Sequence, residues 1–115
     1  MIRVTIVEDD DKIRNNLIDL IEGSEGFRCV AAYSNAEEAL QDIPTKSPNI
    51  VLMDINLPGM DGIECTRRLK IKMPELLIVM LTVYEDANKI FRSLQAGAVG
   101  YLLKLTQPED ILSAL

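Results

Sequence analysis

Five short apolar runs alternate with helical patterns along this 115-residue chain, and this alternation constrains the fold more than any other feature. The runs cover residues 2–7, 27–33, 49–53, 76–81 and 99–103. Apolar runs of this length are typical of strands that are buried on both faces of a parallel sheet. The segments between them are long enough for right-handed crossovers. The sequence therefore predicts a single α/β domain with a doubly wound, five-stranded parallel sheet.

Helix signals lie between the runs. Acidic residues 9–11 favour a helix start, because carboxylates suit a helix N-terminus. The pattern Ser34-Asn-Ala-Glu37 predicts a capping box with Ser34 as the cap. That helix is expected to end near Ile43, since Pro44 and Pro48 follow it.

Two further helices and the start of another are predicted downstream. One runs from Gly62 to about Met73, and the next runs from about residue 85 to 96 and ends at Gly97. The periodicity of the second of these predicts an inward face made by Ala87, Ile90, Phe91 and Leu94. Thr106-Gln-Pro-Glu109 predicts another capping box, so a last helix starts there, and it looks truncated at residue 115.

Polar residues stand where four of the apolar runs end. A flavodoxin-like (βα)5 sheet with strand order 2-1-3-4-5 has its switch point between the first and third strands, and ligands bind outside the carboxyl ends of the strands. Glu8 and Asp9 follow the first run, Asp54 follows the third, and Thr82 and Lys104 follow the fourth and fifth. We therefore expect these side chains to converge on one spot.

Each of these residues also has an ordinary structural interpretation. Acids before a helix are usually caps, and Asp10 and Asp11 are expected to be no more than that. Asp54 could be a solvated turn residue, Thr82 an ordinary strand residue and Lys104 a solvated lysine. Their common position at one edge of one sheet favours a functional site.

The chemistry of this residue set suits a divalent cation and a phosphoryl group. Mg²⁺ prefers oxygen ligands and is usually held by one or two carboxylates, waters and phosphate oxygens. Asp9 and Asp54 could supply carboxylates, Glu8 could add charge, and a backbone carbonyl just after Asp54 could complete the set. Asp54 could also act as a nucleophile toward phosphorus and form an aspartyl phosphate.

Composition excludes several other classes. The net charge of −6 disfavours nucleic-acid binding by this segment itself. The absence of histidine excludes a Ser-His-Asp triad within the chain, and Cys29 and Cys65 are too far apart for a Cys-x-x-Cys motif. No apolar run is long enough for a membrane span, and the start at Met1 does not resemble a signal peptide. We expect a cytoplasmic location with no membrane contact.

Taken together, the motifs resemble the receiver domain of two-component response regulators over essentially the whole chain. They are Ile-Val-Glu8-Asp9-Asp10, Leu-Met-Asp54-Ile-Asn-Leu-Pro-Gly-Met-Asp-Gly62, Met-Leu-Thr82 and Gly-Tyr101-Leu-Leu-Lys104. The resemblance implies that Asp54 is the phosphoacceptor and that Glu8, Asp9, Asp54 and the Asn56 backbone carbonyl bind Mg²⁺. It also implies that Thr82 and Lys104 contact the phosphoryl group, and that Thr82 and Tyr101 form a conformational switch.

The resemblance also implies partners. A sensor histidine kinase would donate the phosphoryl group, and phosphorylation could drive homodimerisation. Leu105 stands where many receivers have proline, which is more similar to LuxR/NarL-type regulators. In such a parent protein, a C-terminal helix-turn-helix effector domain would bind DNA. Two other departures are Val83, where Ala or Ser is common, and Glu8, where Asp is common.

Three alternatives stay open at this point. A Mg²⁺-dependent phosphohydrolase could use Asp54 as nucleophile, but Asn56 stands where that class commonly has a second acid. A pseudo-receiver would not accept phosphate, which the intact set of acids, Thr82 and Lys104 argues against. A flavodoxin-like flavin binder would need a phosphate-binding loop and stacking aromatics that the sequence lacks.

Overall fold

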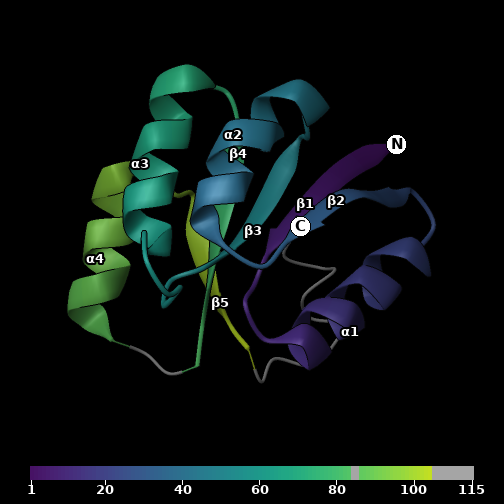
Figure 1. Ribbon diagram of the computed structural model, residues 1–115, viewed down its shortest axis with the longest axis horizontal. Helices are drawn as coiled ribbons and strands as arrows, with labels where there is room; N and C mark the ends of the chain where they lie inside the picture. Colours follow the sequence, from purple (N-terminus) through teal and green to yellow (C-terminus); the bar gives the residue numbers. More distant parts are fainter. Residues whose placement is uncertain (84–85, 105–115) are drawn as a thin grey trace.

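The computed structural model describes residues 1–83 and 86–104 of the chain (Figure 1). Within them, strands β1 (Ile2–Val7), β2 (Phe27–Tyr33), β3 (Ile50–Asp54), β4 (Leu77–Thr82) and β5 (Gly100–Leu103) alternate with helices α1 (Asp11–Glu22), α2 (Ala36–Lys46), α3 (Gly62–Lys72) and α4 (Ala87–Ala96). Each predicted strand lies within one residue of the observed one. The predicted last helix from Thr106, and Leu105 before it, lie outside the described residues.

All five strands are parallel, and their order in the sheet is β2-β1-β3-β4-β5, which confirms the predicted topology. In Figure 1, α1 lies on one side of the sheet, and α2, α3 and α4 lie on the other. Two buried apolar clusters match these two layers. Leu17 and Ile21 of α1 pack in one cluster, and Ile43 of α2 and Leu69 of α3 pack in the other. The apolar faces of these helices therefore cover both faces of the sheet.

Strand register aligns the carboxyl ends of the central strands. Val7 pairs with Met53 between β1 and β3, and Thr82 pairs with Leu103 between β4 and β5. The residues that follow Val7 and Leu103 therefore leave the sheet at the same edge as Asp54. This is how residues far apart in the sequence reach one place.

Helix α2 differs from its prediction at both ends. Asn35, not Ser34, is the N-cap, because its side chain accepts the Glu38 backbone N–H at 2.8 Å. The helix also continues through Pro44 to Lys46 and does not end near Ile43. A proline in the last turn removes only one intrahelical hydrogen bond, so it need not end the helix. The end comes at Ser47, whose φ of 47° is left-handed.

Helix α4 is turned relative to its predicted orientation. Of the four residues predicted to face inward, Ile90 is partly buried, but Ala87, Phe91 and Leu94 are exposed, the last two by 60% and 46%. Ser93 is the buried side chain of the helix. The reason is that α4 packs mainly on α3 and not across the sheet, which favours a face with small residues.

Candidate functional site

Asp54 is the centre of the site. It is the last residue of β3 and is only 1% exposed. The backbone packs closely around it, because a Cβ atom on Gly62 would lie 1.9 Å from the Asp54 carbonyl oxygen. The Gly62 N–H also donates to the Ile55 carbonyl at 2.9 Å. Helix α3 can therefore begin directly against the end of β3 only with glycine at this position.

Glu8 and Asp9 form the acidic loop between β1 and α1. Glu8 is fully buried and accepts the Asp10 backbone N–H at 3.0 Å, whereas Asp9 is exposed. Asp10 is the N-cap of α1 and accepts the Ile13 N–H at 2.9 Å, so the ordinary interpretation of this acid is confirmed. The Glu8 carbonyl in turn accepts a hydrogen bond from the Arg14 guanidinium at 2.8 Å. The loop is thus anchored to the first turn of the helix that follows it.

Lys104 supplies the positive charge of the site. Its ammonium lies 2.7 Å from Glu8 Oε1 and 3.2 Å from Asp54 Oδ1, and its side chain is 10% exposed. The backbone N–H of Lys104 donates to the Thr82 carbonyl at 2.7 Å. The end of β5 is therefore fixed beside the end of β4, and the lysine can reach both carboxylates.

Burial and charge shift the ionisation of the site. Burial raises the pKa of Asp54 to about 7, and the nearby Glu8 charge acts in the same direction. Burial alone would raise the pKa of Asp9, but its hydrogen bond with Asp54 lowers it below the usual value. Burial would also lower the pKa of Lys104, but the Glu8 hydrogen bond and the two carboxylates raise it. Metal-free protein therefore holds an excess of negative charge that one lysine only partly balances.

The donor set fits Mg²⁺. One carboxylate oxygen from each of Glu8, Asp9 and Asp54 lies within 4.8 Å of the others. Glu8 Oε1 is buried, and the Lys104 ammonium lies 2.7 Å from it. Carboxylate oxygens gathered in this way are the ligands that a hard cation such as Mg²⁺ prefers. The cluster therefore agrees with the predicted metal site in residue type and position.

The remaining predicted residues surround this cluster. Thr82 ends β4 and is 4% exposed. The backbone N–H of Asn56 donates to Asp54 Oδ1 at 3.2 Å, so the loop after β3 curls back over the carboxylate. Tyr101 lies on β5, paired in register with Met80, and is 37% exposed. The structure therefore brings Glu8, Asp9, Asp54, Asn56 and Lys104 into direct proximity, and it places Thr82 beside Lys104.

Two residues at the site were missed by sequence reasoning. Lys89, in the first turn of α4, donates from its ammonium to the Asn56 side-chain oxygen at 2.6 Å. Arg14 holds the Glu8 carbonyl as described above. Lys89 could have been noticed because it follows β4 by one short loop, which brings it to the same edge of the sheet. Its specific contact depends on the orientation of α4, which the periodicity did not give.

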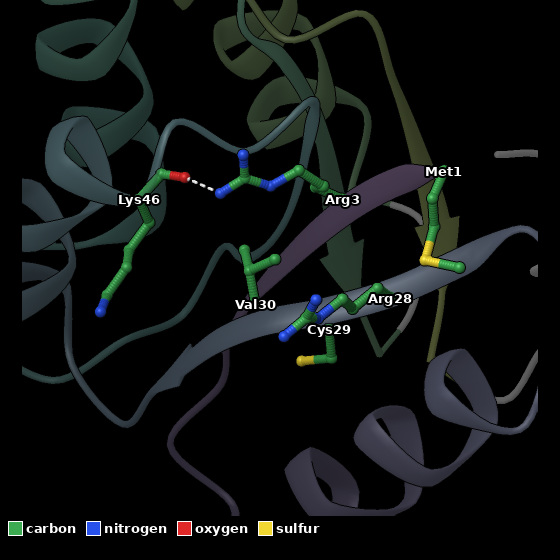
Figure 2. Close-up of a pocket in the computed structure, with 6 residues that line it drawn as sticks. All are labelled: Met1, Arg3, Arg28, Cys29, Val30 and Lys46. Atoms are coloured by element: carbon green, nitrogen blue, oxygen red, sulfur yellow. Dashed lines mark hydrogen bonds between the residues drawn. The ribbon is translucent and has the colours of Figure 1, made fainter.

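A cavity of about 430 Å³ lies well away from this site, at the beginning of β1 and β2 (Figure 2). It is lined by Met1, Arg3, Arg28, Cys29, Val30 and Lys46. Figure 2 shows the Arg3 guanidinium donating to the Lys46 carbonyl at the end of α2. Arg3 therefore caps the C-terminus of that helix, and the cavity contains none of the predicted site residues.

The sequence profile of the response regulator receiver domain family matches residues 4–115. The chain belongs to this family. Over all of its 115 residues it is 38% identical to the response regulator GacA of Pseudomonas viridiflava, of which it covers 54%. It is 35% identical to the transcriptional regulatory protein LnrK of Bacillus subtilis (strain 168), of which it covers 52%.

A solved structure supports the same assignment. The crystal structure of a LuxR-family two-component response regulator from Aurantimonas sp. SI85-9A1 matches with a TM-score of 0.91 and 32% identity, over 97% of this chain and 80% of that one. The predicted family and its general role, receiving a phosphoryl group in two-component signalling, are therefore confirmed. The chain spans about half the length of the curated relatives it matches. No helix within residues 1–83 and 86–104 is long and apolar enough to cross a membrane.

Proposed function

We propose that Asp54 is the phosphoacceptor of this receiver domain, and that phosphorylation of its carboxylate switches the domain between two conformations. The observation that carries the proposal is the buried position of Asp54, 3.2 Å from the Lys104 ammonium and within 4.8 Å of two further carboxylates. A buried carboxylate in such a cluster costs stability unless a cation pairs with it, and a group perturbed in this way is typical of a functional site. The family supplies that role.

Mg²⁺ would be held by Glu8, Asp9, Asp54 and the Asn56 backbone carbonyl. When bound, the ion would neutralise part of the charge on the phosphoryl oxygens. It would also favour the ionised form of Asp54, which burial disfavours. Both effects would make Asp54 a better nucleophile at neutral pH.

The chain's own groups would then position the reaction. An Asp54 carboxylate oxygen attacks phosphorus as the bond to the donor's leaving group breaks. The Lys104 ammonium would move from Asp54 Oδ1 to a phosphoryl oxygen, which it can reach from its present place. The Thr82 hydroxyl would donate to another phosphoryl oxygen. The protein therefore contributes mainly orientation and charge neutralisation, as is usual in phosphoryl transfer.

The output would follow from a local electrostatic change. Movement of Thr82 toward the phosphate would leave room for Tyr101 to turn inward, which would alter the surface around α4 and β5. We propose a sensor histidine kinase as the donor and a homodimer as one consequence of phosphorylation. We also propose that the parent protein continues into a C-terminal helix-turn-helix domain that binds DNA, and that it acts in the cytoplasm as a switch rather than as a turnover enzyme.

Intact mass spectrometry tests this proposal. The wild type incubated with acetyl phosphate and Mg²⁺ should gain one phosphoryl group. The adduct should be absent when Mg²⁺ is chelated and absent from the Asp54→Asn variant. An Asp61→Asn variant, which changes the partly buried N-cap of α3, should still gain the group. A wild type that never gains mass, or an Asp54→Asn variant that does, would refute the assignment.

A further inference from the structure

The contact between Lys89 and Asn56 joins α4 to the loop that follows the phosphoacceptor. The Lys89 ammonium donates to Asn56 Oδ1 at 2.6 Å. The Lys89 backbone is held in place, because its N–H donates to the N-cap Asp86 and its carbonyl accepts the Ser93 hydroxyl at 2.8 Å. The position of this ammonium is therefore set by the first turn of α4.

Asn56 is close enough to Asp54 to influence what reaches it. Its backbone N–H lies 3.2 Å from Asp54 Oδ1, and its side chain is exposed. The side chain is therefore open to the solvent that supplies any attacking water, two residues after the buried carboxylate. A side-chain amide offers one acceptor oxygen and one donor nitrogen. In this structure the oxygen is turned toward the Lys89 ammonium, which uses one of its two lone pairs.

Loss of the phosphoryl group requires a water molecule in line with the bond to Asp54. The water oxygen bonds to phosphorus as the bond from phosphorus to the Asp54 oxygen breaks. The electron pair of that bond returns to the Asp54 carboxylate. The two water protons finish on the released orthophosphate. An acceptor that orients the water speeds such a step, and a side-chain amide can serve in this way.

We infer that Lys89 is a positioning residue that prolongs the phosphorylated state by holding the Asn56 side-chain oxygen toward α4, so that it does not orient the attacking water. This inference rests on the proposed phosphorylation of Asp54. It identifies the contact between α4 and the β3–α3 loop as a determinant of how long the signal lasts. It also makes the lifetime sensitive to any partner that moves the first turn of α4.

Phosphate decay tests the inference. The protein is phosphorylated with acetyl phosphate, freed of the donor, and its remaining adduct is followed by intact mass. Lys89→Met should lose the group about three- to tenfold faster than the wild type, because one hydrogen bond no longer restrains the amide. Lys89→Arg keeps a donor and should decay within about twofold of the wild type. Lys72→Met, an exposed change at the end of α3, should decay like the wild type and controls for lost charge.

A double-mutant cycle separates this route from direct contact between Lys89 and the phosphate. In an Asn56→Ala background, Lys89→Met should not change the rate of phosphate loss further, because the Asn56 side-chain oxygen is already absent. The inference is overturned if Lys89→Met leaves decay unchanged or slows it, or if its effect persists fully without the Asn56 side chain.

A second measurement does not depend on phosphorylation. In NMR spectra of the unphosphorylated protein, the Asn56 side-chain amide resonances should shift in Lys89→Met and much less in Lys89→Arg. Unshifted resonances in Lys89→Met would show that the contact does not form, which also overturns the inference. If the resonances shift but the wild type takes up no phosphoryl group, the proposed function fails instead.

Discussion

At the scale of single residues, the site is a buried cluster of negative charge stabilised by one lysine. Burial and the Glu8 charge raise the pKa of Asp54 to about 7 in the metal-free protein. The unfolded chain would release that proton near the usual value of about 4. Between these pH values the folded state binds more protons than the unfolded state. The contribution of Asp54 to stability therefore falls as pH rises from about 4 to about 7.

The first prediction concerns Asp54→Asn without Mg²⁺. The free energy of unfolding of the variant should match that of the wild type near pH 4. It should exceed the wild-type value by about 4 kcal/mol near pH 8, because the amide carries no buried charge. Urea titrations across this pH range measure the difference. Asp19→Asn, an exposed change on α1, is the control, and a difference that does not vary with pH would contradict the prediction.

The second prediction concerns Lys104→Met. Without the ammonium, Glu8 and Asp54 would lose the cation that lies 2.7 Å and 3.2 Å from them. Metal-free protein at pH 7 should therefore lose about 3 kcal/mol of stability. The loss should shrink near pH 5, where Asp54 is largely protonated. The variant should still bind Mg²⁺ but should respond poorly to phosphorylation, and full retention of stability at pH 7 would argue against the ion pairs.

Residue types and strand ends in the sequence were sufficient to predict the acids, Thr82 and Lys104 at one edge of the sheet. The Lys89–Asn56 contact could not be predicted in the same way. It depends on how a helix is turned and on which rotamer a long side chain adopts, and neither is encoded in a short motif. The acids and Lys104 were therefore easier to predict from the sequence than Lys89 and its contact with Asn56.

At the scale of elements, the close packing of α3 on β3 fixes the carboxylate. A methyl group on Gly62 would collide with the Asp54 carbonyl oxygen at 1.9 Å. Because that neighbour is backbone, it cannot move aside without displacing the end of the strand. The start of α3 and the proposed phosphoacceptor Asp54 therefore share one structural constraint.

The third prediction follows from this constraint. Gly62→Ala should destabilise the protein by about 3 kcal/mol and slow phosphorylation of Asp54 by more than tenfold, because α3 and Asp54 must separate. Thermal unfolding and the rate of adduct formation measure the two effects. Gly100→Ala, at the start of β5, is a control for loss of a glycine, because an added Cβ there meets no atom within 4 Å. Normal phosphorylation by a folded Gly62→Ala protein would show that the packing is not needed for function.

Helices were predicted less accurately than strands. The central strands β1, β3 and β4 are largely buried on both faces, so their apolar runs mark them within a residue. Helix α4 contains apolar residues on more than one face, and its exposed Phe91 and Leu94 follow the same spacing as core positions would. Which face turns inward depends on the fit to α3, which the sequence pattern alone does not determine.

At the scale of the whole molecule, topology and register turn a scattered set of residues into one site. The predicted sheet order is confirmed, and it places β1 beside β3. The acidic loop after β1 therefore meets the end of β3 at the switch point. The carboxylates at this edge carry part of the net charge of −6. A divalent cation that binds them should therefore stabilise the entire domain.

The fourth prediction is that Mg²⁺ raises the midpoint of thermal unfolding of the wild type in a concentration-dependent manner. If Mg²⁺ binds only the folded state, it should add about 2–3 kcal/mol to the free energy of unfolding at a hundredfold excess over Kd. Asp9→Asn should reduce the increase at the same Mg²⁺ concentration, whereas Asp19→Asn should not. An equal increase in all three proteins would indicate binding elsewhere.

The most direct test of the central claim is to locate the phosphoryl group chemically. Protein treated with acetyl phosphate and Mg²⁺ is reduced with borohydride, which converts an aspartyl phosphate to homoserine, and is then sequenced by peptide mass spectrometry. We predict homoserine at position 54 alone, and none when Mg²⁺ is chelated. Homoserine at another aspartate, with Asp54 unmodified, would contradict the account.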